Sequence, residues 1–401
     1  MMNEKKYLDN DDAVISFSTY DEMQQYLDFR KENDEWLKEY INDLACYGIP
    51  NYSLFVPGNC TNIEIDKVAY KMKIEDIDFE AANNKECIAN ECLFIVANYN
   101  GKMIAIPTRP LAFNSICQRA DLFCGTMTRS DEKTNKLILP IDEKAKWITR
   151  AFQLYGDLCK ILYRDGKISA VLSKDYQILP CDELIDVLEK KLKMTYPNIL
   201  FESGMANHEF FVARYALNDK TIEETLRLKL NDYGSDINSV KVGVQFNTSD
   251  VGLSSVNANI YITLDGVNVF LDGISMPHKG DASIERFDDL LSDFDLVLQE
   301  AEERVEELGN MDIKDVKCVV ELVTKAYSTI FPKTATEEVL LELTGAGTGI
   351  DVFIALNDII NRHVKNNNIN PTRFLNMTEM LYKLIKIPFD KLETGEFSLK
   401  K

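Results

Sequence analysis

The sequence is poor in the residues on which metal chemistry depends. It contains only three histidines (208, 278 and 363), and no second histidine lies at ligand spacing from His278. The nine cysteines are odd in number and scattered, and the one close pair, Cys87 and Cys92, has neither a second pair nor a histidine nearby. We therefore predict reduced thiols and no bound metal.

Motifs for nucleotide binding and covalent catalysis are also missing. There is no Gly-x4-Gly-Lys-Ser/Thr loop and no Gly-x-Ser-x-Gly elbow, and His208-Glu209 fails as a zinc-protease motif because the fifth residue is Val212. The glycines of Gly345-Ala-Gly347-Thr-Gly349 follow helical sequence rather than a strand, so they predict a helix-to-helix connection. Since no motif assembles a nucleophile, a base and an orienting group, we expect no cofactor and rank an enzyme below a binding protein.

Long apolar runs are absent as well. No window approaches 18 consecutive apolar residues, and the first twelve residues, MMNEKKYLDNDD, are acidic where a signal peptide is apolar. The composition, 45% hydrophobic and 27% charged, is that of an ordinary globular protein. The sequence thus predicts no membrane partner and a cytoplasmic location.

Acidic residues outnumber basic ones, which gives a net charge of −20, and they are unevenly distributed along the chain. Residues 1–90 contain 9 Lys/Arg against 19 Asp/Glu, and residues 281–345 contain 6 against 17, whereas residues 91–200 contain 16 against 13. Most of the surface would repel phosphate, so contact with nucleic acid requires a local basic face. The arginines in this stretch that we expect to contribute to such a face are Arg109, Arg119, Arg129 and Arg150. Interleaved acids such as Asp131 and Glu132 leave a solvated helix surface as the alternative.

Alternating apolar and polar residues predict antiparallel strands between residues 240 and 272. Val240 to Phe246 alternate in this way, and so do Ala258 to Leu264, which lead into Asp265-Gly266, a strong hairpin signal. A two-residue turn there would pair Leu264 with Val267, Ile262 with Val269, Tyr261 with Phe270 and Ile260 with Leu271. Asn100-Gly101 and Asp165-Gly166 predict two further hairpins of the same kind.

Helical periodicity is expected at both ends of the chain. Residues 20–47 predict one long helix, and residues 51–86 an irregular or accessory β segment. We expect Asp182 to cap a helix through Leu192, and Thr221 with Glu224 to form the capping box of a helix ending at Leu230. Helices are further expected over 283–309, 312–331, 336–344, 349–364 and 371–387.

These elements predict an α+β fold, with an antiparallel sheet built from hairpins, helices packed on one face and a C-terminal helical lobe. We divide the chain into an acidic N-terminal lobe (1–90), an antiparallel β-rich α+β core (91–280) and a helical C-terminal lobe (281–401).

The residue most suggestive of a site is His278, in the loop between the third strand and the acidic helix. Asp272 precedes it, and Asp250 lies in the facing turn with Asn247 and Ser249. A cluster for metal binding or general-base catalysis is one interpretation. A ligand or phosphate contact and a turn-stabilising side chain are the others.

Aromatic residues occur on strand sequence near basic ones. Tyr176, Tyr215, Tyr261 and Phe270 are placed in this way. Aromatic platforms beside a basic groove are typical of single-strand binding. Aromatic residues at alternating strand positions are more often core residues or cross-strand pairs.

Two patches carry a resemblance to a known family. The first is a strand, the turn Asn247-x-Ser249-x-x-Gly252, two strands ending in Asp272-Gly273, and His278-x-Gly280; the second is Ser173-Lys-Asp-Tyr176 followed by a helix at Asp182. This order resembles the uncharacterised phage/plasmid-like protein family found on prophages and conjugative plasmids, although that family has Asn where this chain has Asp272. The similarity spans roughly residues 95–365 and implies a bacterial host cell, but no reaction.

Two hypotheses follow. The first is a non-enzymatic mobile-element protein that handles nucleic acid, as a single-strand binding or annealing protein. The residues expected to contact nucleic acid or a ligand are Arg109, Arg119, Arg129, Arg150, Tyr176, Asn247, Ser249, Asp272 and His278. The second is an acidic protein-binding module, such as a counter-defence inhibitor or DNA mimic, with a basic protein as partner. An enzyme of unknown class ranks third, and a homo-oligomer stays open.

Overall fold

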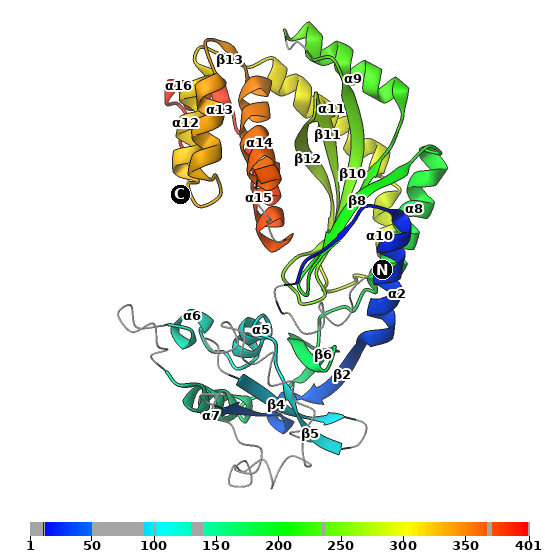
Figure 1. The fold of residues 1–401 in the computed structure, drawn as a ribbon, viewed down its shortest axis with the longest axis vertical. Coiled ribbons are helices and arrows are strands. Elements are labelled where there is room, and N and C mark those ends of the chain that lie inside the picture. The colour runs from blue at the N-terminus through cyan, green and yellow to red at the C-terminus, as the bar shows by residue number, and fades with distance from the viewer. Residues whose placement is uncertain are drawn as a thin grey trace.

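The computed structural model describes residues 11, 13–49, 92–99, 102–129, 139–234, 237–366 and 371–399, and these form two lobes (Figure 1). The larger lobe has one hydrophobic core that joins residues 17–27 to residues 179–392, and the core of the smaller lobe comes from residues 41–171. The cores therefore group the chain differently from the three consecutive segments expected from the sequence. The expected irregular segment 51–86 lies outside the described residues.

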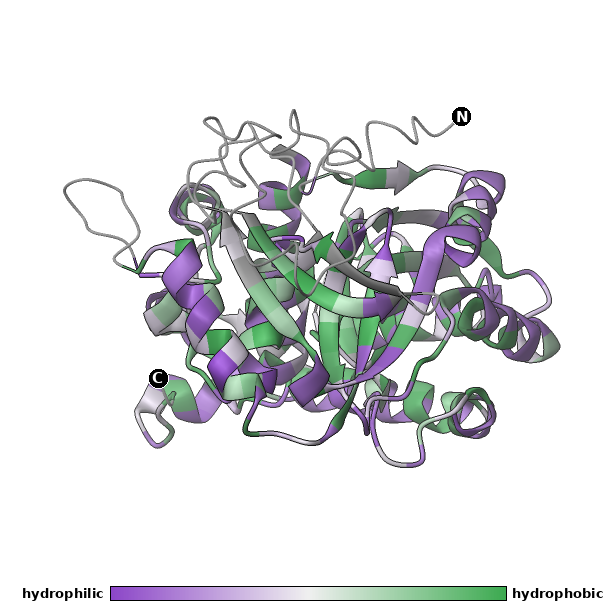
Figure 2. Ribbon diagram, turned by 90° about the horizontal axis from the view of Figure 1, so that it is seen from below, coloured by the Kyte–Doolittle hydropathy of each residue, from purple (hydrophilic) through white to green (hydrophobic). Residues whose placement is uncertain are grey.

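The large lobe is built on a six-stranded antiparallel sheet. Its strand order is β1 (Ile15–Phe17), β8 (Leu200–Ala206), β9 (Phe211–Ala216), β10 (Val240–Thr248), β11 (Val256–Leu264) and β12 (Val267–Met276). Many residues of these strands are hydrophobic, whereas the outer helices contain many hydrophilic residues (Figure 2). The α+β class and the antiparallel sheet with helices packed on it are confirmed.

Helices cover both faces of the sheet, which corrects the expectation that they pack on one face only. On one face, α2 (Tyr20–Asn33), α8 (Cys181–Thr195) and α10 (Ile284–Leu291) pack on side chains such as Phe246, whose ring meets Phe287 of α10. On the opposite face, Phe270 of β12 meets Phe374 and Tyr382 of α15 (Pro371–Leu384). The remaining helices of this lobe are α9 (Lys220–Asp232), α11 (Phe294–Gly309), α12 (Val316–Ala326), α13 (Lys333–Glu342), α14 (Gly349–Asn366) and α16 (Phe389–Thr394).

In its described part, the small lobe contains two three-stranded sheets and three helices. One sheet has the order β2 (Asp34–Tyr40), β6 (Leu158–Arg164), β7 (Lys167–Ser173), and the other has the order β3 (Ala45–Ile49), β4 (Cys92–Tyr99), β5 (Lys102–Pro107). The helices are α5 (Ala112–Arg119), α6 (Cys124–Met127) and α7 (Ile141–Phe152), and a 3-10 turn, η1 (Ile41–Asp43), precedes β3.

The predicted hairpins are present. The register at Asp265-Gly266 pairs Leu264 with Val267, Ile262 with Val269 and Tyr261 with Phe270, as expected. A bulge then shifts the pairing, so that Asn259 faces Gly273 and the expected pairing of Ile260 with Leu271 is not formed. Strands β6 and β7 flank Asp165-Gly166, and β4 and β5 flank residues 100–101, which lie outside the described residues.

The single long helix over residues 20–47 is wrong beyond Asn33. Asp34 takes an extended conformation, and β2 then pairs with β6 from Asp34 opposite Arg164 to Tyr40 opposite Leu158. The partner strand lies more than a hundred residues away in the sequence, so tertiary pairing overrides the local helical pattern.

Two helix starts and one helix interior also differ from expectation. Asp219, not Thr221, caps α9, because its carboxylate accepts the backbone N–H of Thr221 at 2.9 Å, while Glu224 pairs with Arg227 instead. Pro180 precedes α8, which places Asp182 in the first turn rather than at the cap. The helix expected over 283–309 is interrupted between α10 and α11.

The segment 345–349 connects α13 to α14 as expected, through β14 (Gly347–Thr348), which pairs with β13 (Asp312–Ile313).

Candidate functional site at the junction of the two lobes

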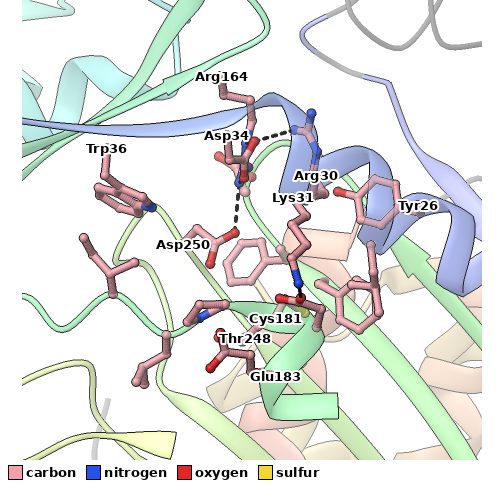
Figure 3. Close-up of a pocket in the computed structure, with 18 of the residues that line it drawn as sticks. Tyr26, Arg30, Lys31, Asp34, Trp36, Arg164, Cys181, Glu183, Thr248 and Asp250 are labelled. Atoms are coloured by element: carbon pink, nitrogen blue, oxygen red, sulfur yellow. Dashed lines mark hydrogen bonds and ion pairs between the residues drawn. The ribbon is translucent and has the colours of Figure 1, made fainter. Parts of the chain in front are cut away.

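A cavity of about 210 Å3 lies where the two lobes meet. The large lobe contributes the end of α2, the start of α8, the turn between β8 and β9, and the end of β10. The small lobe contributes the start of β2 and the end of β6. Figure 3 shows that charged side chains of both signs and the ring of Trp36 surround this space.

Arginines and aspartates alternate in a chain along one wall of the cavity. Arg30 donates two hydrogen bonds to Asp165, at 2.8 and 3.0 Å, and another of its nitrogens lies 3.4 Å from Asp34. Arg164 pairs with Asp34 and lies 2.9 Å from Asp250 (Figure 3). Burial lowers the pKa of Arg164, but the two carboxylates outweigh burial and hold that pKa well above its usual value.

The chain continues deeper into the small lobe. Arg109 is fully buried, pairs with Asp11 and lies 3.5 Å from Asp165. Lys167 lies 3.5 Å from Asp11. Because each of these basic groups meets at least one aspartate, the buried charges compensate one another and bind the small lobe to α2 of the large lobe.

The Asp165-Gly166 turn places the central carboxylate of this chain. Asp165 and Gly166 both adopt positive φ, 56° and 77°, the conformation that a two-residue hairpin requires. Asp tolerates this region better than most residues, and Gly has no side chain to oppose it. The hairpin tip thereby points the Asp165 carboxylate at Arg30 of α2.

Three stacked rings lie beside the cavity. Trp36 stacks on Tyr176 at 5.9 Å, and Tyr176 stacks on His278 at 4.9 Å with an interplanar angle of 3°. Burial lowers the pKa of His278, so its ring is neutral near pH 7. The carbonyl oxygen of Gln177 can only accept, so Nδ1–H of His278 donates to it, and Nε2 accepts from the hydroxyl of Thr248; both distances are 3.1 Å.

Cys181 is the first residue of α8 and lines the cavity. Burial, together with the nearby Asp250, raises the pKa of its thiol well above the usual value. The sulfur is therefore a protonated thiol at neutral pH and not an activated nucleophile.

The arginines expected to form one contact surface differ in their exposure. Arg109 is buried in ion pairs, which corrects its assignment to an exposed basic face: its guanidinium compensates Asp11 and Asp165. Arg119 is half-buried, whereas Arg129 and Arg150 are exposed.

The other expected residues gather near the turn after β10. Tyr176 donates a hydrogen bond to the carbonyl of Ser249 at 3.0 Å, and His278 stacks on it. Asn247 is buried and lies 3.4 Å from the hydroxyl of Ser254. Asp272 belongs to β12, and its side chain lies outside what the structure describes.

The ion-paired residues of the cavity wall were not expected from the sequence. Arg30 and Asp34 fall in the stretch expected to be a continuous helix, and Arg164 and Asp165 were assigned only to a hairpin. The sequence contains one sign of this cluster: Arg164-Asp165-Gly166 places two charged side chains at a hairpin tip.

Among the described residues, no group of three or more His, Cys, Asp or Glu side chains is arranged to hold a metal ion. No helix in the described part of the chain is long and apolar enough to span a bilayer. No family model, curated protein or solved structure matches this chain.

Proposed function

We propose that this protein binds single-stranded nucleic acid without changing it chemically, through the exposed surface of α6 and α7 in the small lobe. The observation that carries the proposal is the exposure of two aromatic side chains near arginines. Phe123 is 78% exposed at the start of α6, and Arg129 follows two residues after its end. Trp147 of α7 is 55% exposed, and Arg150 lies one turn further on.

Stacking on exposed rings and pairing of arginines with phosphates is how single strands are held without sequence readout. The charge distribution supports the same location, because residues 91–200 carry more basic than acidic side chains, while residues 281–345 are strongly acidic. A phage or plasmid setting, which the family resemblance implies, is part of this proposal.

The test is the affinity for a labelled oligothymidylate, measured by fluorescence anisotropy over a salt series. Arg129→Glu with Arg150→Glu should weaken binding at least about tenfold at low salt. Loss of two phosphate contacts should also reduce the slope of log affinity against log salt by about 1.4. The matched control is Lys325→Glu with Lys333→Glu on α12 and α13, since both lysines are exposed and the charge change is the same.

A second pair of variants tests stacking. Trp147→Ala and Phe123→Ala should each cost about 1–3 kcal/mol of binding free energy if a base stacks on the ring. Leu341→Ala, at a site 80% exposed on α13, should have no effect. Absence of binding at low salt, or equal losses in the control variants, would overturn the proposal and favour the acidic surface of the large lobe as the binding surface.

A further inference from the structure

We propose that the cavity at the lobe junction binds a small organic cation, an ammonium or guanidinium group carried on a short apolar body. The site is separate from the surface on α6 and α7, so this inference does not depend on the proposed function. Its basis is the charge that remains on the cavity wall after the internal ion pairs are counted, combined with the apolar character of the rest of the wall.

The basic groups on the wall already have partners. Arg30 and Arg164 are held by the aspartates described above, and Lys31 lies 2.7 Å from Asp182. Two further carboxylates line the cavity, Glu183 and Glu209.

Neither carboxylate lies within ion-pair distance of a described basic side chain; Glu183 acts on Lys31 only at longer range, beside that lysine's direct partner Asp182. Glu183 is exposed in the first turn of α8 and takes part in no ion pair with a described side chain, and Glu209 accepts a hydrogen bond from the hydroxyl of Thr372, a neutral donor. Among the described residues, the lining thus has five carboxylates against three basic side chains, an excess of two negative charges. A cation entering the cavity would gain a favourable interaction with both.

The rest of the lining suits an apolar body. Aromatic and aliphatic side chains from both lobes form it: Tyr26, Leu27, Trp36, Ile178, Phe210 and Phe211. The indole of Trp36 is half-buried, and an aromatic face beside carboxylates attracts cations through the ring quadrupole.

The volume of the cavity and the negative charge of its lining argue against larger ligands and against anions. A volume of about 210 Å3 lies below the range of about 300–1,000 Å3 that is typical of pockets for drug-sized ligands. The N-terminus of α8 would by itself favour an anion, but Asp182 and Glu183 already occupy its first turn. A phosphate or carboxylate would meet this negative charge, while every described basic side chain of the lining already takes part in an ion pair.

The probe is phenethylamine, with phenylacetate and 2-phenylethanol as anionic and neutral compounds of similar shape. Binding is measured by isothermal titration at low salt. The amine should bind with a Kd of about 1 mM or below, and the two other compounds at least about tenfold more weakly. Glu183→Gln with Glu209→Gln should weaken amine binding by about tenfold.

Two controls make the result decisive. Glu337→Gln with Glu338→Gln removes the same charge from the exposed surface of α13 and should leave amine binding unchanged. Ile178→Phe fills the cavity from a half-buried loop position and should abolish binding, with folding checked by circular dichroism. Tighter or equal binding of phenylacetate or phenylethanol, or an equal loss in the α13 control, would overturn the inference. So would a failure of the amine to bind.

Discussion

The chain contains two Asp-Gly hairpin turns with the same backbone and different roles. At the tip of β6 and β7, Asp165 and Gly166 have φ of 56° and 77°; at the tip of β11 and β12, Asp265 and Gly266 have φ of 45° and 91°. Both turns join strands whose flanking residues pair directly, Arg164 with Lys167 and Leu264 with Val267. The local sequence has therefore produced the same structure twice.

The two aspartate side chains differ in their surroundings. The carboxylate of Asp165 is fully buried between Arg30 and Arg109, where it links the small lobe to α2. The carboxylate of Asp265 is exposed and accepts the backbone N–H groups of Asn238 and Ser239, at 3.1 and 2.8 Å. The Asp-Gly dipeptide therefore determines the turn. The residues that the fold brings next to the aspartate determine whether its carboxylate links distant parts of the chain or stabilises only the turn.

The largest expected effect comes from removing the buried charge. Asp165→Asn keeps the shape of the side chain and tolerates positive φ, so it changes little except the charge. It leaves Arg30 and Arg109 partly uncompensated in a buried site, and breaking such a pair costs about 3–5 kcal/mol of folding free energy. Denaturant unfolding followed by circular dichroism measures this loss.

Asp265→Asn is the matched control, because it makes the same chemical change in the same turn. If both variants unfold at the same denaturant concentration, the buried ion pairs do not stabilise the lobe junction and the contrast between the turns is only geometric.

An intermediate and equal effect is expected from the two glycines. Gly166→Ala and Gly266→Ala each force a side chain into positive φ, which costs about 1–2 kcal/mol. A Cβ atom at either position meets no atom within 4 Å, so steric contact adds nothing in either turn. Unfolding free energies that differ between the variants by more than about 1 kcal/mol would show that the turns are not equivalent in their backbones.

The hairpins could be predicted because their information is local. Turn type and alternation over about ten residues determine which residues face each other. Counting residues outward from the Asp265-Gly266 turn predicts that Tyr261 pairs with Phe270, as it does. The alternation of apolar residues does not give the bulge near Asn259, which adds one residue to β12. The available signal was Gly273, which faces Asn259, because a glycine inside a strand often marks a bulge.

The candidate site could be predicted only in part. Tyr176, Ser249 and His278 do lie together, because the segments that follow β7, β10 and β12 meet at the lobe junction. The role of Arg109 could not be derived, since its partners Asp11 and Asp165 lie 98 and 56 residues away and nothing in a linear pattern records which charges will be buried together. For the same reason, β2 could not be predicted, because it forms a strand by pairing with β6, which is distant in the sequence.

The smallest expected effect is a pH dependence confined to the exposed turn. Hydrogen bonds from the backbone N–H groups of Asn238 and Ser239 lower the pKa of Asp265 in the folded protein. A carboxylate with a depressed folded pKa contributes stability above its unfolded pKa, about 3.9, and loses that contribution as pH falls through the folded value. Wild type should thus be slightly more stable than Asp265→Asn at pH 7, and the gap should close below about pH 4. Urea unfolding midpoints of both proteins across this range measure the gap, and a gap that stays constant with pH would show that the ionised carboxylate does not stabilise this turn.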